Sequence, residues 1–438
     1  MTTPAAPSPM PASTIDAGLV ASLRGLGRDG RLLFATRVLR MFAYGFLAVI
    51  LVLYLAELGI DGFTIGAILT LTLIGDTLIS LWLTTRADRI GRRLVLVVGS
   101  LLMAGAGFSF ASTSSVPWLI IVATIGVISP TGNEVGPFLA VEQAALSQAT
   151  PDARRTPTFA WYNLAGYVAT AVGALSAGFL TQALISAGVT ALAAYKVIVV
   201  GYGVVGLVMA VVFWRVGAAV EAPEPPAADD GIARRLGLSP RSRGIVGRLS
   251  ALFSLDAFGG GFIPQSLMAY WFHVRYGVEP ALLGGIFFGA NLLAAVSSLS
   301  ASRIAARFGL VNTMVFTHLP SNVFLILVPL MPNLALAITV LLLRFSLSQM
   351  DVPTRQSYVM AVVDPGERSA AAGVTGIART TGAALSPVLS APLVASGGLT
   401  AVPFFLAGGL KIVYDLLLYR AFRSGRAPDE RQPVKPAG

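Results

Sequence analysis

The sequence contains no cysteine and only two histidines among its 438 residues. Without cysteine there can be no disulfide, no thiol chemistry and no cysteine-ligated metal. The two histidines, His273 and His318, lie far apart in the sequence, so we expect no metal site. Charged residues are also scarce, at 12% of the chain against roughly 25% in typical soluble domains.

Several chemical motifs are missing as well. No phosphate-binding loop of the form Gly-x-x-x-x-Gly-Lys-Ser/Thr occurs, so ATP is not the expected energy source. A nucleophile elbow and a His-Glu-x-x-His motif are absent too. We therefore expect neither enzymatic activity nor a cofactor.

Apolar sequence is abundant, because 55% of the residues are hydrophobic. Apolar runs of about 20 residues, each long enough to cross a bilayer, recur along nearly the whole chain. We predict an all-α membrane protein with twelve transmembrane helices, at residues 33–58, 63–84, 94–111, 117–145, 158–182, 189–214, 249–272, 280–301, 310–330, 334–361, 369–395 and 401–421. The short alternating strands of a transmembrane barrel are missing.

The formal net charge of +10 does not indicate a nucleic-acid partner, because the basic residues are unevenly distributed. Most lysines and arginines fall in the tails and in alternate loops, whereas the opposite loops contain only Arg275. This asymmetry follows the positive-inside rule and predicts that both termini are cytosolic. Residues 1–32, rich in Pro, Ala and Ser, and 422–438 are then cytosolic tails, and the former lacks the order of a signal peptide.

Residues 215–248 form the one long interruption of the apolar pattern. The segment carries acidic residues and prolines, followed by arginines from Arg234 to Arg248. It predicts a cytosolic linker between an amino-terminal bundle, 33–214, and a carboxy-terminal bundle, 249–421. A tether resting on anionic lipid and a regulatory segment both remain open.

A dense run of charge, residues 85–93, separates the second and third apolar segments and marks a tight loop at the membrane surface. Its Arg89-Ile90-Gly91 is echoed by Arg307-Phe308-Gly309 in the second half. Pro151-Asp152-Ala153-Arg154-Arg155 is similarly echoed by Pro365-Gly366-Glu367-Arg368. The halves therefore read as weak parallel repeats.

With its Asp-Arg-x-Gly-Arg-Arg loop and two six-helix halves, the chain resembles the major facilitator superfamily of secondary transporters over essentially its whole length. The resemblance implies alternating access, a small-molecule substrate, and a monomer in the plasma (inner) membrane. It also implies that the loop acts as a gate, bracing helix 2 against helix 11. The gating residues would be Asp88, Arg89, Arg92 and Arg93, although Thr84 stands where the family often has glycine.

Charged residues inside the spans indicate a site, because a charge at the bilayer centre costs roughly 2.5–3.5 kcal/mol. In helix 334–361, Arg344, Ser348, Asp351 and Arg355 are spaced to share one face. Helix 117–145 carries Asn133, Glu134 and Glu142, and the two glutamates are spaced to share a face. By resemblance, helices 1, 4, 7 and 10 line the central cavity.

These residues divide into candidate roles, with alternatives. The substrate-binding candidates are Arg344, Ser348, Arg379, Glu134, Asn133, Tyr162, Asn163, Gln265 and Asn291. The proton-coupling candidates are Glu134, Asp76 and Asp256, since a partly desolvated carboxylate can exchange protons near neutral pH. Asp351 and Arg355 join the gating candidates, and Arg344 has the alternative role of bracing the two halves. Lys411 and Asp415 are spaced for an intrahelical pair, while Tyr270 and Trp271 are expected at the membrane interface.

The expected function is proton-coupled export of a small amphipathic or drug-like solute, with the proton gradient as energy source. Gly166, Gly173 and Gly178 loosely resemble the glycine-rich stretch of the family's antiporters and favour export slightly. Arg344 and Arg379 keep open the uptake or export of a small organic anion. A receptor or scaffold that binds ligand without transport is the alternative from another class.

Overall fold

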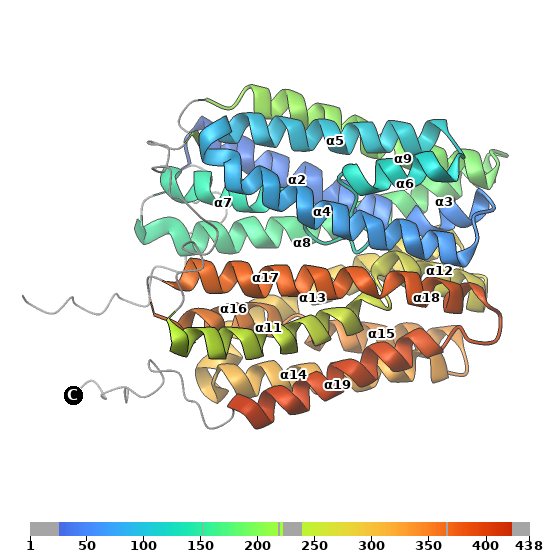
Figure 1. Ribbon diagram of the computed structural model, residues 1–438. Helices are drawn as coiled ribbons and strands as arrows, with labels where there is room; N and C mark the ends of the chain where they lie inside the picture. Colours follow the sequence, from blue (N-terminus) through green and yellow to red (C-terminus); the bar gives the residue numbers. More distant parts are fainter. Residues whose placement is uncertain (1–25, 151, 218–219, 222–238, 365–366, 423–438) are drawn as a thin grey trace, which may run out of the picture.

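The computed structural model describes residues 26–150, 152–217, 220–221, 239–364 and 367–422, and this part contains helices and no strand (Figure 1). The amino half contains α2 (Arg28–Ala48), α3 (Leu51–Glu57), α4 (Gly62–Ile90), α5 (Arg92–Ser112), α6 (Val116–Ile125), α7 (Phe138–Ala149), α8 (Asp152–Ser186) and α9 (Ala191–Trp214). The carboxy half contains α11 (Pro240–Gly261), α12 (Gln265–Tyr276), α13 (Pro280–Phe308), α14 (Leu310–Leu327), η3 (Val328–Leu330), α15 (Leu334–Leu347), α16 (Asp351–Val362), α17 (Arg368–Leu385), α18 (Pro387–Ala395) and α19 (Val402–Phe422).

The helices agree with the predicted all-α membrane class. By length and composition, eight helices among the described residues can cross a membrane, or nine if the bent pair α2 and α3 is one span. Each of the twelve predicted segments coincides with one helix or with consecutive shorter helices. The first helix begins at Arg28 rather than at residue 33, and α11 begins at Pro240 rather than at residue 249.

Five of the twelve predicted segments consist of two consecutive helices, with breaks between α2 and α3, α6 and α7, α11 and α12, α15 and α16, and α17 and α18. Helix-breaking residues explain most of these interruptions. The gap from α6 to α7 contains three glycines and two prolines between Gly126 and Pro137. Pro264 precedes α12, and Pro387 begins α18, where a missing backbone N–H costs nothing.

The two halves lie side by side (Figure 1), and most of the contacts between them come from two regions, with a smaller contact between α3 and α12. Helix α8 runs along α13, and α4 packs against α17 and α18. Glycines allow these close approaches: a Cβ atom at Gly66 would lie 2.6 Å from the Pro387 carbonyl oxygen, and one at Gly284 would lie 2.8 Å from that of Ala174. Helix α2 starts and α19 ends at the same end of the bundle (Figure 1).

The tight loops predicted after the second and eighth segments adopt matching conformations. Gly91 ends α4 and precedes α5 with φ 106°, and Gly309 ends α13 and precedes α14 with φ 84°. Both conformations lie where side chains with a Cβ are disfavoured. The repeated Arg-x-Gly pattern therefore builds the same turn in each half.

Candidate functional site

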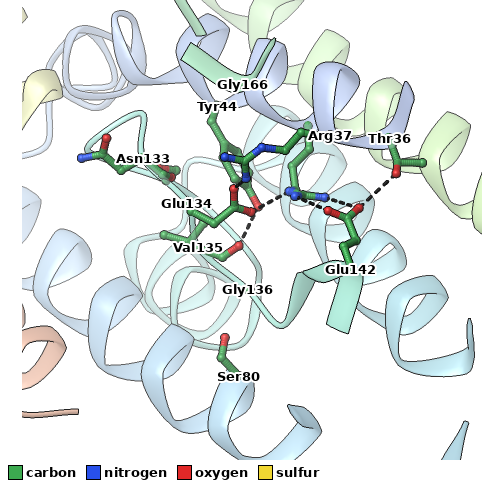
Figure 2. Close-up of polar contacts among 12 residues, drawn as sticks. Thr36, Arg37, Tyr44, Ser80, Asn133, Glu134, Val135, Gly136, Glu142 and Gly166 are labelled. Carbon is green, nitrogen blue, oxygen red and sulfur yellow. Dashed lines mark hydrogen bonds and ion pairs between the residues drawn. The ribbon is translucent and has the colours of Figure 1, made fainter. Parts of the chain in front are cut away.

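Each half of the bundle encloses a cluster of charged side chains. The amino-half cluster consists of Thr36, Arg37, Arg40, Glu134, Glu142 and Tyr162. Figure 2 labels Thr36, Arg37, Glu134 and Glu142 of this cluster. The carboxy-half cluster consists of Asp256, His318, Asn322, Asp351, Arg355, Lys411 and Asp415. The broken helices contribute α2 and α7 to the first cluster and α11 and α16 to the second.

Arg40 is the centre of the amino-half cluster. Its two terminal nitrogens donate to the Glu142 carboxylate at 2.8 and 2.7 Å, and its Nε donates to Glu134 at 2.7 Å. The side chains of Arg40 and Glu142 are both 0% exposed. Arg37 forms an ion pair with the other oxygen of Glu134, and the Tyr162 hydroxyl donates to Glu142. Two cations therefore balance two carboxylates away from water, as buried charges require.

Glu134 reaches this cluster from a non-helical connector, residues 126–137, and not from a helix. The expectation that Glu134 and Glu142 share a helical face was therefore wrong, although both bind Arg40. Side chains from other helices hold the connector: the Tyr44 hydroxyl donates to Val135 O at 2.9 Å, and Asp76 accepts the Gly136 amide at 2.6 Å. Since Gly136 has φ 81°, its missing Cβ permits the turn.

Asp256 occupies the equivalent central place in the carboxy-half cluster. It accepts a hydrogen bond from Lys411 Nζ at 2.6 Å and lies 3.5 Å from Arg355 Nη1. Arg355 also donates to Asp351 at 2.5 Å, one turn earlier in α16. All four side chains are nearly or fully buried. The structure thus places Asp351 and Arg355 in the same cluster as Asp256.

His318 of α14 closes the cluster on the side of α19. Its Nδ1 lies 2.9 Å from Asp415, its Nε2 lies 3.8 Å from Asp256, and Asn322 donates to the other oxygen of Asp415 at 2.9 Å. The predicted pairing of Lys411 with Asp415 within one helix was wrong, because Lys411 extends to Asp256 on α11. Sequence reasoning considered His318 only in arguing against a metal site, and it missed the carboxylate partners of this residue.

Arg344 differs from these paired cations. It lies in the last turn of α15, where the helix C-terminus favours a positive charge. Its Nε is shielded from solvent without a hydrogen-bond partner, and the buried Ser348 hydroxyl, one turn later, is also unpartnered. Its guanidinium packs over the Phe345 ring at 4.9 Å and lies within electrostatic reach of Asp256. These two unsatisfied groups sit where helix 334–361 breaks.

Three contacts lie between the halves near the clusters. The Tyr167 side chain of α8 hydrogen-bonds Ser298 of α13 and lies within electrostatic reach of both Arg37 and Asp351. The Gln265 side chain accepts from Asn291 at 3.3 Å, and a Cβ atom at Gly132 of the opposite half would lie 3.4 Å from it. The Ser266 amide also donates to Pro130 O at 3.1 Å. Both clusters are therefore close to the interface between the halves.

The remaining predicted site residues lie outside these clusters. Asp76 accepts from Gly136 and from the Ser80 hydroxyl, at 2.6 and 3.2 Å, and so holds the connector. Asn133 and Asn163 are exposed. Arg379 is half-buried on α17 and makes no ion pair within the described part of the chain. Trp271, expected at the membrane interface, is instead 0% exposed and packs against Phe404.

The charged loop after α4 contacts the beginning of the linker. Glu221 accepts hydrogen bonds from the amides of Arg92 and Arg93 at 2.6 and 3.2 Å, which satisfies the first turn of α5. The Arg92 side chain also donates to Gln148 at 2.9 Å. Arg89 is exposed, and the Asp88 side chain, expected to brace helix 11, lies outside the described side chains.

Sequence reasoning missed Arg37 and Arg40, which supply the positive charges of the amino-half cluster. The available signal was their spacing: two arginines three residues apart occupy the middle of the first apolar helix and share one face. The structure adds the role of Gly166, where a Cβ atom would lie 2.8 Å from Arg37 Nε. That glycine makes room for the guanidinium.

The chain is similar to known membrane transporters. The family model of the Major Facilitator Superfamily matches residues 33–387. A Saccharomyces cerevisiae protein described as an uncharacterized membrane protein is 30% identical over 432 residues, covering 92% of this chain and 96% of that protein. The match to the family model contains the helices from α3 to α17 in full, and α19 follows it.

Solved structures share the fold at low sequence identity. A variant of the nucleoside transporter NupG has a TM-score of 0.72 at 14% identity, covering 90% of this chain and 99% of that one. A bacterial homolog of the human lysosomal transporter Spinster has a TM-score of 0.66 at 15% identity, covering 93% and 98%. The human organic anion transporter MFSD10 has a TM-score of 0.58 at 17% identity, covering 89% and 99%. The chain belongs to the major facilitator superfamily, and it is a multi-pass membrane protein and a secondary transporter, not an enzyme.

Proposed function

We propose that this protein is a proton-coupled secondary transporter of a small organic anion, and that Arg344 and Ser348 bind the anionic group. The observation that carries the proposal is a combination: Arg344 has no ion pair among the described residues, and its Nε and the Ser348 hydroxyl, one turn later, both lack hydrogen-bond partners. Shielded polar groups without partners are rare in folded proteins and call for an explanation such as a missing ligand. A carboxylate or phosphate would satisfy both donors at once.

The charge balance around Arg344 supports an anionic ligand. The fully or nearly buried Arg37, Arg40, Arg355 and Lys411 each contact a carboxylate. Arg344 has electrostatic contact with Asp256, but Lys411 and Arg355 already occupy that carboxylate. An incoming anion would therefore meet a cation without a dedicated counterion. The alternative role of Arg344 as a brace gains no support, since it forms no ion pair across the halves among the described residues.

The expectation of drug export has less support. Gly178 of α8 packs against Pro280 and Gly284 of α13, and Gly173 packs against Phe42. Gly166 accommodates Arg37. Since close packing explains all three glycines, they give no reason to prefer export, and we propose no direction. The titles of the similar structures name a nucleoside transporter and an organic anion transporter, so the fold alone does not choose the substrate.

Proton coupling is proposed from the buried titratable groups close to Arg344. Of the predicted carriers, Glu134 is held by two arginines, and Asp76 is held by Gly136 and Ser80. Asp256 belongs to a cluster that also contains an imidazole and lies within electrostatic reach of Arg344. A proton taken up in that cluster would change the charge felt by an anion at Arg344.

Thermal stabilisation of the purified protein tests the substrate class. Lactate, benzoate and succinate represent organic anions, adenosine a neutral solute, and tetraphenylphosphonium a lipophilic cation. We expect stabilisation by at least one anion, lost in Arg344→Ala and partly kept in Arg344→Lys, since a ligand that binds the native state raises its stability. Lys196→Ala is the matched control, because Lys196 is a half-buried cation in α9.

The same panel separates the alternatives. Stabilisation by tetraphenylphosphonium that survives Arg344→Ala would favour an exporter of amphipathic solutes and refute the anion proposal. Binding of an anion without any flux into proteoliposomes would indicate a receptor. Flux of the stabilising anion, driven by an inside-alkaline pH gradient, is the result that the proposal requires.

A further inference from the structure

We infer that His318 is the residue whose protonation couples to substrate: an anion at Arg344 and a proton on His318 Nε2 bind together. The inference rests on the proposed anion site and adds to it the group that carries the proton. It depends on two observations. His318 lies between two carboxylates, and the charges of the carboxy-half cluster sum so that protonation of the imidazole would compensate the charge of a bound anion.

The hydrogen bonds of His318 determine which nitrogen exchanges the proton. Nδ1 lies 2.9 Å from Asp415 Oδ1, and an ionised carboxylate can only accept, so this contact favours the tautomer in which Nδ1 carries the hydrogen. Asn322 donates to Asp415 Oδ2 at 2.9 Å, which fixes the carboxylate in place. The nitrogen left to gain or lose a proton is Nε2, which faces Asp256 at 3.8 Å.

Every charged group around His318 is identified among the described residues. Helix α11 contributes Asp256, helix α16 contributes Asp351 and Arg355, and helix α19 contributes Lys411 and Asp415. The Tyr414 ring meets the imidazole edge to face at 6.0 Å. From α15, Arg344 acts on the cluster through Asp256.

Adding these charges shows how binding is coupled. Asp256, Asp351 and Asp415 carry three negative charges, and Arg355 and Lys411 carry two positive charges. With Arg344 included, the group is neutral when His318 is neutral. An anion at Arg344 adds one negative charge, and protonation of His318 restores neutrality. Because unbalanced charge is costly in a buried site, the anion and the proton should each favour binding of the other.

The location of His318 also suits a coupling role without direct contact with substrate. It lies in α14 and is 4% exposed, so it is shielded from bulk solvent. Asp256 connects it to Lys411, Arg355 and, electrostatically, Arg344. His318 is therefore a positioning and charge-balancing residue, and Arg344 is the one that contacts the anion.

The chain offers a direct test, because it contains only two histidines. Isotope labelling of histidine gives two imidazole signals by NMR, and His273→Gln assigns them. His273 is exposed and bonds a backbone carbonyl, so its replacement leaves the cluster intact. We expect benzoate, or whichever anion of the panel stabilises the protein most, to raise the pH of half-protonation of His318 by about one unit. By reciprocity, that anion should bind about tenfold more tightly when His318 is protonated.

The outcomes separate the inference from the proposed function. A rise that is present in wild type and absent in Arg344→Gln supports both. An anion that binds at Arg344 while the His318 titration stays unchanged overturns the inference and leaves the proposed function standing. If no anion of the panel binds, the proposed function fails, and the coupling fails with it.

A transport assay with His318→Gln provides the second readout. Glutamine can still donate a hydrogen bond to Asp415 but cannot carry the proton. We expect this variant to exchange labelled for unlabelled anion across the membrane while losing accumulation driven by a pH gradient. Undiminished accumulation by a folded His318→Gln protein would refute the inference. Asp415→Asn, which keeps the shape of the partner and removes its charge, should lower the pH at which accumulation is half-maximal.

Discussion

Arg40 of α2 and Glu142 of α7 form a two-pronged ion pair at 2.8 and 2.7 Å, with neither side chain exposed. The carboxy half contains a counterpart with the charges exchanged, because Asp256 lies on α11 and Arg355 on α16, 3.5 Å apart. Each pair joins the first helix of its half to the second part of a broken helix. The repeated fold is thus kept while the polarity of its central ion pair is reversed.

Removing one member of the amino-half pair should destabilise the protein strongly. Arg40→Gln leaves the buried carboxylates of Glu142 and Glu134 with less positive charge, and the cost of breaking a buried pair is about 3–5 kcal/mol. We expect a much lower apparent Tm in detergent, whereas the exposed Arg275→Gln should change it little. Replacing both partners, Arg40→Met with Glu142→Leu, should recover part of the loss. Equal thermal stability of Arg40→Gln and wild type would contradict this.

Ser348→Ala should weaken anion binding without affecting the fold. The Ser348 hydroxyl has no protein partner to lose, so its removal should leave the Tm of the ligand-free protein unchanged or slightly raised. A hydrogen bond to a charged group is worth about 1.5–3 kcal/mol, which predicts roughly a 10- to 100-fold loss of affinity. Isothermal titration with the stabilising anion measures the change. Unaltered affinity would remove Ser348 from the site.

Glu134→Gln should reduce stability and preserve proton coupling. Glu134 is the carboxylate that contacts Arg37, and losing its charge leaves this buried arginine without its ion-pair partner. Accumulation driven by a pH gradient should persist in the protein that folds, because the coupling site proposed above lies in the other half. If Glu134→Gln transports the anion but its accumulation no longer depends on the pH gradient, the proton carrier is Glu134 and not His318.

Glu367 should hold the carboxyl end of the linker in a pH-dependent way. Hydrogen bonds from the Ser242 hydroxyl and the Ser239 amide lower the pKa of the Glu367 carboxyl. Its contact therefore stabilises the folded state above the unfolded pKa, about 4.3, and is lost as the pH falls through the lower folded value. Hydrogen exchange at the Ser239 amide should be faster in Glu367→Gln near neutral pH. If the exchange rates of Glu367→Gln and wild type differ equally well below the folded pKa of Glu367, its carboxylate is not the cause.

The membrane class and the succession of apolar segments could be predicted because they depend on local composition. Segment length and charge placement are sufficient to find them, as residues 62–90 and 191–214 illustrate. The helix breaks were harder to predict. Pro130 and Pro137 were visible, but the path between them depends on hydrogen bonds with Tyr44, Asp76 and Tyr202, which are distant in sequence.

The site was predicted less completely for a similar reason. A charged residue inside an apolar run can be recognised from the sequence alone, and Glu134, Asp256 and Arg344 were identified in this way. The partner of such a charge cannot be recognised in the same way, because Lys411 and Asp256 are 155 positions apart and Arg40 and Glu142 are 102 positions apart. Helical spacing favoured the nearer pair of Lys411 and Asp415, which the packing of α11 against α19 overrides.

Simultaneous measurement of anion and proton flux in proteoliposomes tests the central claim most directly. Labelled anion reports substrate entry, and a pH-sensitive dye in the lumen reports proton entry. We expect anion uptake to acidify the lumen in wild type, His318→Gln to exchange anion without acidification, and Arg344→Gln to do neither. Anion uptake by wild type with no proton movement, or uptake that survives in Arg344→Gln, would contradict the central claim.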